Sequence, residues 1–63
     1  MSDKRGYSPD EAADYLGIAV SKVRRRMRER VLPARKDGRD VIIDRSDLDA
    51  YFDRLPSESG ANP

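Results

Sequence analysis

Three helix-stopping residues, Gly17, Pro33 and Pro56, divide this sequence into short segments. These segments hold little apolar material, since only 37% of the 63 residues are hydrophobic and 40% are charged. A chain of this length buries only about 60% of the surface that its unfolded form exposes. The sequence therefore predicts one small domain without an enclosed substrate or cofactor pocket, which is typical of a binding module.

Two of the side chains that enzymes most often use for catalysis are absent. The sequence has no Cys and no His, which excludes disulfides, thiolate and imidazole metal ligands, Cys nucleophiles and His bases. Tyr15 and Tyr51 fit core positions better than a recombinase nucleophile, which needs basic and general-acid groups around it. Acidic residues stand at expected helix starts, where they favour the helix dipole: Asp10, Glu11, Asp44 and Asp47. We expect no catalytic residue, cofactor or metal site, and no enzyme activity.

Both ends of the chain are polar. Residues 1–6 lack the apolar stretch of a signal peptide, and residues 56–63 have too little apolar surface to offset the entropy of ordering. We expect a disordered N-terminal arm over residues 1–6, a domain over residues 7–55 and a disordered C-terminal tail over residues 56–63. Because no signal peptide is evident at the N-terminus, the expected location is the cytoplasm.

Charge is strongly segregated along the chain. Between Lys22 and Arg39 there are nine basic and two acidic residues, a net charge of +7, whereas the rest of the chain carries −6. Because salt screens charges over roughly 8 to 10 Å, the distant acids do not cancel this patch. The pattern predicts a cationic face that binds nucleic acid and no membrane. A solvated helix face without a partner is the alternative.

Residues 8–17 carry the signals of a first helix. Ser8 is the expected N-cap, Pro9 suits the first helical position, and Glu11 completes a capping box three residues after Ser8. The helix is expected to end at about Leu16, where Gly17 supplies a left-handed stop. Its buried side would use Ala12, Tyr15 and Leu16.

A second helix is expected over residues 20–30. Val20, Val23 and Met27 recur at the spacing of one helix face, and basic residues occupy the others. Arg26 falls on the boundary, so its stem would lie along the core while its guanidinium reaches water or phosphate. The sequence thus predicts an amphipathic helix with a cationic outer surface.

The next segment has the pattern of a basic-tipped β-hairpin. An Asp37-Gly38 turn would join residues 34–36 to residues 39–43, because this dipeptide readily adopts a tight primed turn. Alternation along the second strand buries Val41 and Ile43 and leaves Ile42 outward. An outward Ile42 is either an ordinary exposed residue or a partner contact.

A last helix is expected to run to about Leu55. Asp44 or Ser46 can cap its start. Its apolar stripe at helical spacing consists of Leu48, Tyr51, Phe52 and Leu55. The complete order is α-α-β-β-α, a mostly α fold with a small β-hairpin. Helix, tight turn, basic helix and basic hairpin together predict a winged helix-turn-helix.

The stretch from Tyr7 to Leu55 also resembles a known group, the excisionase family of MerR-like winged-helix DNA-binding domains. The resembling segments are YSPDEAADYLGI, VSKVRRRMRERVLPA, the DG turn and IIDRSDLDAYF. The resemblance implies a second helix that reads a groove and a wing that contacts the DNA backbone. For stand-alone phage members it implies a recombination directionality factor. Such factors bind DNA in adjacent copies, bend it and help a phage integrase to catalyse excision in the bacterial host.

Three residues depart from the pattern of that family. Ala19 stands where the family usually has a Ser-type cap, which weakens the start of the second helix by about 1 kcal/mol. Arg26 replaces an apolar or aromatic residue, and Arg30 replaces a Gly. The two arginines suggest a longer second helix and a different approach of the wing.

Helix geometry and the chemistry of base edges assign roles to the basic residues. The residues expected in the major groove are Ser21, Lys22 and Arg25, of which Arg25 can bind a guanine through two hydrogen bonds. For Ser21 the alternative is a hydrogen bond at the helix start. The residues expected on the DNA backbone are Arg24, Arg26 and Arg28. Those expected to contact DNA from the wing are Arg35, Lys36 and Arg39.

The principal functional prediction is a sequence-specific, DNA-bending excisionase whose partners are double-stranded DNA, a phage integrase and neighbouring copies of itself. Two other hypotheses remain open at this point. The first is a small winged-helix transcription regulator, which would use the same surface. The second is a protein-interaction adaptor whose basic helix docks an acidic partner.

Overall fold

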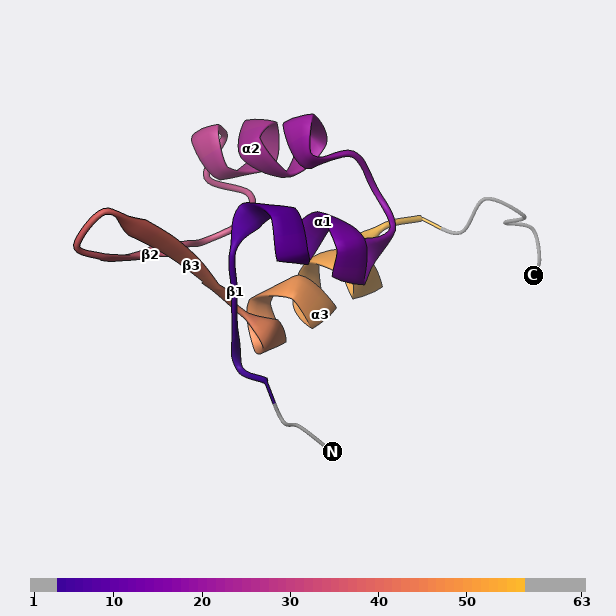
Figure 1. Ribbon diagram of the computed structural model, residues 1–63. Coiled ribbons are helices and arrows are strands. Elements are labelled where there is room, and N and C mark those ends of the chain that lie inside the picture. Colours follow the sequence, from indigo (N-terminus) through magenta and orange to yellow (C-terminus); the bar gives the residue numbers. More distant parts are fainter. Residues whose placement is uncertain (1–3, 57–63) are drawn as a thin grey trace.

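The computed structural model describes residues 4–56 and contains three helices and three short strands within them. They follow one another as β1 (Gly6–Tyr7), α1 (Pro9–Leu16), α2 (Val20–Arg28), β2 (Arg35–Asp37), β3 (Asp40–Asp44) and α3 (Arg45–Arg54) (Figure 1). This architecture confirms the predicted winged helix-turn-helix. The longest helix in the described part has 10 residues, too short and too polar to span a membrane.

The sheet contains a strand that the sequence did not indicate. β1 pairs antiparallel with β3, with Gly6 opposite Asp44 and Tyr7 opposite Ile43, so the strand order is β1-β3-β2. The backbone N–H of Arg45 also donates to the carbonyl oxygen of Arg5 at 2.8 Å. Arg5 and Gly6, which were expected in the disordered arm, are therefore held by main-chain hydrogen bonds at the edge of β3. Residues 1–3 and 57–63 lie outside the described residues.

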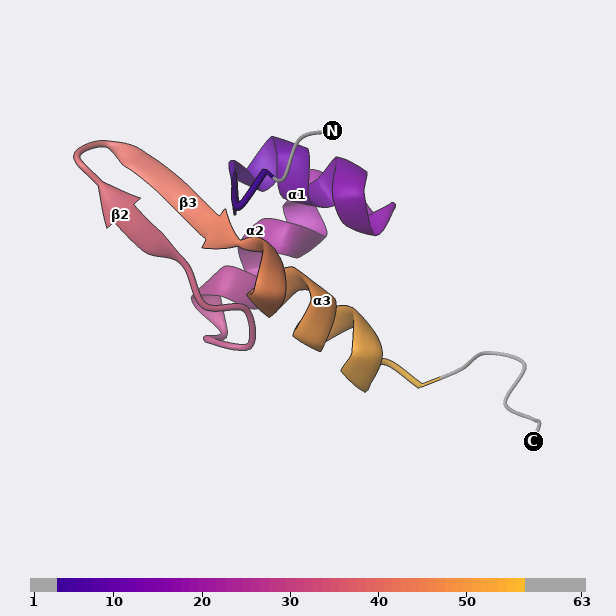
Figure 2. The ribbon, with the colours of Figure 1, turned by 90° about the horizontal axis from the view of Figure 1, so that it is seen from below.

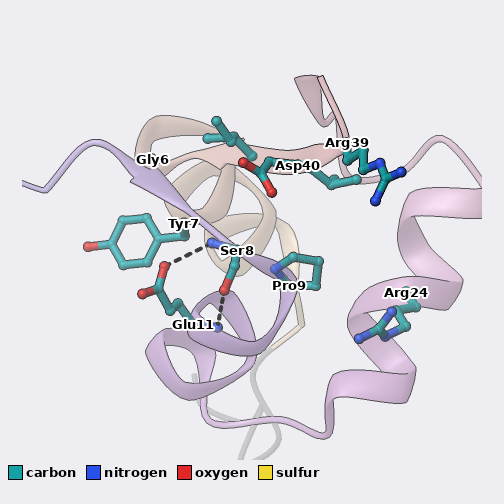
Figure 3. Close-up of a pocket in the computed structure, with 10 residues that line it drawn as sticks. Gly6, Tyr7, Ser8, Pro9, Glu11, Arg24, Arg39 and Asp40 are labelled. Carbon is teal, nitrogen blue, oxygen red and sulfur yellow. Dashed lines mark hydrogen bonds between the residues drawn. The ribbon is translucent and has the colours of Figure 1, made fainter. Parts of the chain in front are cut away.

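The start and stop of α1 are those predicted. Ser8 Oγ accepts a hydrogen bond from the Glu11 backbone N–H at 3.1 Å, and the Glu11 carboxylate accepts one from the Ser8 N–H at 3.0 Å (Figure 3). Gly17 follows the helix with φ 74°, in the left-handed region. The capping box and the glycine stop are both confirmed.

The buried side of α1 differs from the prediction at Tyr15. Ala12 and Ala13 are buried, whereas Tyr15 is 44% exposed and its hydroxyl donates to Asp49 on α3 at 2.5 Å. Ala13, rather than Tyr15, is therefore the second buried residue of α1. The expectation that Tyr15 is a core residue was wrong.

α2 is shorter than predicted and ends at Arg28 rather than Arg30. Arg30 has φ 63°, and its N–H donates to the Met27 carbonyl at 3.1 Å while the N–H of Val31 donates to the Arg26 carbonyl at 2.9 Å. This pair of hydrogen bonds is a Schellman motif, which closes a helix through a left-handed residue. The prediction that Arg30 lengthens the second helix was therefore wrong, because Arg30 adopts the left-handed conformation itself. At its start, Ala19 makes no side-chain capping hydrogen bond, as expected.

The hairpin turn is displaced by one residue from the prediction. Asp37 pairs with Asp40, so the two turn residues are Gly38 and Arg39. Gly38 has φ 66° and Arg39 has a negative φ, the sign pattern of a type II′ turn, which favours Gly in the first central position. Asp37 therefore belongs to β2, and Arg39 lies at the tip.

On β3, Ile43 is buried as predicted, and Val41 is half-buried. Ile42 was expected to point outward, but it is half-buried as well. Its Cγ2 atom lies 2.6 Å from the position that a Cβ at Gly6 would take. The N-terminal strand therefore covers Ile42, which the sequence left as a candidate partner contact.

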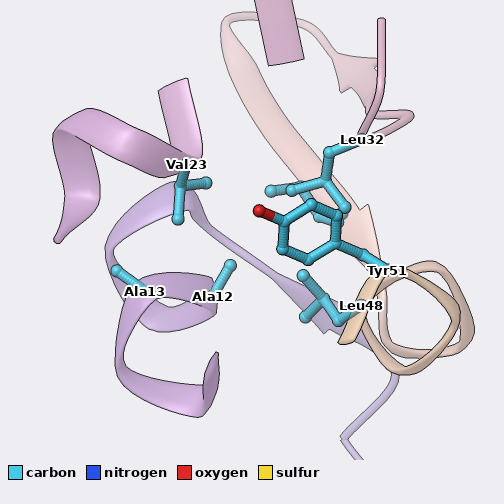
Figure 4. Packing of buried hydrophobic residues seen from close by; sticks show 7 residues of the cluster. Ala12, Ala13, Val23, Leu32, Leu48 and Tyr51 are labelled. Carbon is cyan, nitrogen blue, oxygen red and sulfur yellow. The ribbon is translucent and has the colours of Figure 1, made fainter. Parts of the chain in front are cut away.

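The core is a single cluster between the helices and β3 (Figure 4). Its buried members are Ala12, Ala13, Val23, Leu32, Ile43, Leu48 and Tyr51. β3 leads directly into α3 (Figure 2). Leu48 and Tyr51 of α3 are buried in this cluster (Figure 4). The predicted stripe is buried only in part, since Phe52 is 57% and Leu55 44% exposed. Two short helices and a narrow sheet cover one side of α3 and leave these residues in solvent.

We expect Leu48→Ala to lower the free energy of unfolding by about 3 kcal/mol, because it empties a fully enclosed position. Phe52→Ala, on the same helix, should change this free energy by less than about 1 kcal/mol because its ring is mostly exposed. Urea denaturation of both variants measures the difference. Equal losses would contradict the division of α3 into a buried and an exposed side.

We also expect stability to fall in acid through two capping carboxylates. Hydrogen bonds from Lys4 and from the Ser8 backbone lower the pKa of Glu11 from its ordinary 4.5. The Ser46 backbone N–H and the nearby Arg5 lower the pKa of Asp44 from 3.8. A carboxylate whose pKa is lower in the folded state stabilises it above the unfolded pKa, and this contribution disappears as pH falls through the folded pKa.

Denaturation of the wild type should therefore become easier below about pH 4.5, the ordinary value for Glu. The double variant Glu11→Gln, Asp44→Asn should show a shallower decline in stability over the same range of pH. An unchanged dependence in the double variant would mean that other groups control acid unfolding.

Candidate nucleic-acid interface

A basic helix and a hairpin that carries three cations form the outer part of the domain. The wing, defined here as β2, β3 and the turn between them, projects away from the three helices (Figures 1 and 2). α2 lies across the outside of the helical part, with Val23 as its only buried residue. A helix and an extended hairpin are therefore both available to one elongated partner.

The three residues predicted for the major groove lie together on α2. Ser21, Lys22 and Arg25 are all exposed, while Val23 between them points into the core. Within residues 4–56 their side chains form no hydrogen bond or ion pair, so the alternative helix-start hydrogen bond of Ser21 is absent there. Their donors are available to a ligand, and contact with bases stays a prediction.

Arg26 has a different environment from its basic neighbours. Its Nε donates to the Tyr51 hydroxyl at 3.3 Å, and a terminal nitrogen pairs with the Glu29 carboxylate at 2.8 Å. The hydrogen bond to Tyr51, followed by that to Glu29, raises the pKa of Arg26 above its ordinary value. The guanidinium thus links α2 to α3, and it would have to leave these partners to grip a phosphate.

Arg24 and Arg28, the other two backbone candidates, are exposed. Arg24 lies 4.0 Å from the Asp10 carboxylate, a weak surface pair. It also borders a hollow of about 490 Å³ that Arg39 of the wing turn borders from the other side (Figure 3). The fold thus brings a helix cation and a wing cation, 15 positions apart in the sequence, to one depression, which Glu11 and Asp40 also border.

The wing residues Arg35, Lys36 and Arg39 are exposed. Arg35 and Lys36 are successive residues of β2, and side chains of successive strand residues point to opposite faces. Lys36 borders a second hollow, of about 720 Å³, between the end of α2 and the wing. The wing therefore presents cations on both faces and at its tip.

Arg30 belongs to this basic surface, although the sequence did not indicate it. A continuous helix would have placed residue 30 on the apolar face, near Val23. α2 ends at Arg28, and the backbone of Arg30 is in the left-handed region. The Arg30 side chain is therefore exposed and borders the second hollow together with Arg28 and Lys36. The signal that could have revealed it is the arginine at a position where the resembling family has Gly.

Comparison with known families agrees with this geometry. Residues 7–56 match the family described as "Helix-turn-helix domain". The chain belongs to this helix-turn-helix family. Its members are DNA-binding domains and include excisionase-like proteins. No curated protein and no solved structure matches the chain. The family match establishes the helix-turn-helix part of the resemblance and supports DNA as the partner of the basic surface.

We expect Arg26→Ala to destabilise the domain by about 1 to 2 kcal/mol, because it removes the hydrogen bond to Tyr51 and the packing of the arginine stem. Arg28→Ala, an exposed position on the same helix, should change stability by less than about 0.5 kcal/mol. Urea denaturation compares the two variants. A change at Arg26 as small as that at Arg28 would show that the link between α2 and α3 contributes nothing measurable.

Proposed function

We propose that this protein is a sequence-specific excisionase, a DNA-binding and DNA-bending factor that directs a phage integrase toward excision. One observation carries the DNA-binding part. In a helix-turn-helix domain, the segment from Lys22 to Arg39 has a net charge of +7 and covers most of the exposed helix α2, the connection after it, β2 and the wing turn. The acidic residues of the chain lie mostly outside this segment.

In this proposal α2 enters the major groove, with Ser21, Lys22 and Arg25 facing base edges. Arg25 binds a guanine through two hydrogen bonds, the most common specific contact of this kind. Arg24 and Arg28 grip phosphates beside the groove and fix the position of the helix without reading sequence.

The wing extends the contact along the duplex. Arg35 and Lys36 bind the backbone, and Arg39 at the tip reaches an adjacent phosphate or a narrow minor groove. Because helix and wing contact separate parts of the duplex, bending the DNA toward the protein increases the number of contacts.

The small size of the domain supports action in several copies. A single module of this kind covers about 600 to 1,000 Å² of DNA-facing surface, which gives modest affinity. Neighbouring copies on tandem sites raise the effective affinity of each one. The assignment to excision, to a phage integrase as partner and to the cytoplasm of a bacterial host rests on the resemblance of Tyr7–Leu55 to the excisionase family.

DNA binding is tested with a duplex that the protein selects from a random-sequence pool. If about six cations neutralise phosphates, log affinity should fall against log salt concentration with a slope of roughly −5. The double variant Lys22→Ala, Arg25→Ala should lose at least about 100-fold in affinity for the selected site. Arg45→Ala removes an exposed arginine outside the basic segment and should bind as the wild type does. Unaltered binding by the double variant would remove Lys22 and Arg25 from the interface. If the wild type selected no duplex, or if the slope were near zero, the protein-interaction adaptor would be favoured.

The excision role is tested separately with the integrase of the same mobile element. Purified protein added to an in vitro recombination reaction should increase excision and reduce integration. The DNA-binding double variant should have no effect on either direction. Unchanged directionality with the wild-type protein would reject the excisionase role, leave DNA binding intact and favour the transcription regulator.

A further inference from the structure

Arg30 has a backbone conformation that suits glycine. It is the only non-glycine residue with a positive φ among residues 4–56, at 63°. In this region the Cβ atom of an L-residue crowds the backbone, which Gly avoids. Residues outside the favoured regions of φ and ψ are often retained because their side chains have a function.

At the end of α1, the residue in the equivalent left-handed conformation is a glycine. α1 ends in a matching Schellman motif, in which the Ile18 N–H donates to the Ala13 carbonyl at 3.0 Å and Gly17 has φ 74°. At the end of α2, the Val31 N–H donates to the Arg26 carbonyl at 2.9 Å. The two helix ends have equivalent backbone geometry, so the geometry gives no reason for an arginine at position 30.

The surroundings of Arg30 supply a reason. Together with Arg28 and Lys36 it borders the hollow of about 720 Å³ between the end of α2 and the wing. No acidic residue borders this hollow, and the other residues around it are apolar: Met27, Leu32, Pro33, Ala34 and Val41. Three cations thus share one depression without a carboxylate to neutralise them. Like charges repel one another, so an anion in the hollow would stabilise all three.

We propose that Arg30 contacts the DNA backbone and that, with Arg28 and Lys36, it forms a phosphate seat between α2 and the wing. This proposal rests on the proposed DNA-binding function, which requires α2 and the wing to lie on one duplex. A strand passing from the groove that holds α2 to the wing crosses the hollow between them. A guanidinium at position 30 binds a phosphate there, which a glycine would not do.

The dipole of α2 offers a purely structural explanation that the test must separate. A cation near a helix C-terminus interacts favourably with the partial negative charge there. If Arg30 serves only this purpose, its removal should lower stability and leave DNA affinity unchanged. If Arg30 binds a phosphate, its removal should leave stability unchanged or higher and should lower DNA affinity.

The test compares Arg30→Gly with the wild-type protein, as full chains, in thermal unfolding and in DNA titrations at several salt concentrations. Arg30→Gly should melt at the same or a higher temperature, because the backbone strain is relieved. Its DNA affinity should fall about eightfold at 0.1 M salt, and the salt slope should become shallower by about one, as for one lost phosphate contact. The loss should be equal on selected and unrelated duplexes, because phosphates carry no sequence information.

Two further variants separate charge from chain flexibility. Arg30→Asn also tolerates the left-handed region but is neutral, so it should lose affinity as Arg30→Gly does. Arg30→Lys keeps the charge and should retain most of the affinity. Arg45→Gln, which removes an equal charge outside the basic segment, should bind as the wild type does.

If both Arg30→Gly and Arg30→Asn bound DNA with the affinity and salt slope of the wild type, the phosphate seat would be overturned. The proposed DNA-binding function would still hold, because the wild type binds the duplex. A lower melting temperature with unchanged affinity would assign Arg30 to the helix dipole instead. If the wild type itself bound no duplex, the proposed function would fail, and the seat with it.

Discussion

The basic helix is held to the domain along a single apolar line. Val23 is the only buried residue of α2, and Val20 and Met27 pack partly against the same core. Because these positions recur at three- and four-residue spacing, they attach the helix by one side. The other sides stay in water, where charged groups need no partner. A nine-residue helix with five basic residues can therefore fold onto a small core without burying uncompensated charge.

Acidic and basic side chains have different roles in this fold. Glu11 and Asp44 satisfy backbone N–H groups at the starts of α1 and α3. Among the basic residues of α2, Arg26 turns inward to Tyr51 and Glu29. The remaining cations of α2 and the wing are exposed, and most carboxylates lie on other parts of the chain, although Asp37, Asp40 and Asp44 belong to the wing. The result is a nearly neutral chain with a strongly cationic surface, as a DNA-binding module requires.

The parts of the site that depend on neighbours in the sequence were predictable. Ser21, Lys22 and Arg25 were expected on the exposed side of α2 because helical spacing alone separates them from Val23. Long-range contacts were not predictable in the same way. The link from Arg26 to Tyr51 spans 25 positions. The place of Arg30 beside the wing depends on a backbone conformation that helical periodicity does not indicate.

The sequence by itself determined the order of the fold, the capped starts of α1 and α3, and the glycine stop of α1. Those signals act over a few residues, so no distant part of the chain can override them easily. Only the tertiary structure decided that Gly6 and Tyr7 form a strand, and that Tyr15 and Phe52 remain exposed while Ala13 is buried. The pattern of apolar residues in the sequence indicates which side chains favour burial. Which of them achieve it depends on how much surface the neighbouring elements can cover, and in so short a chain that surface is small.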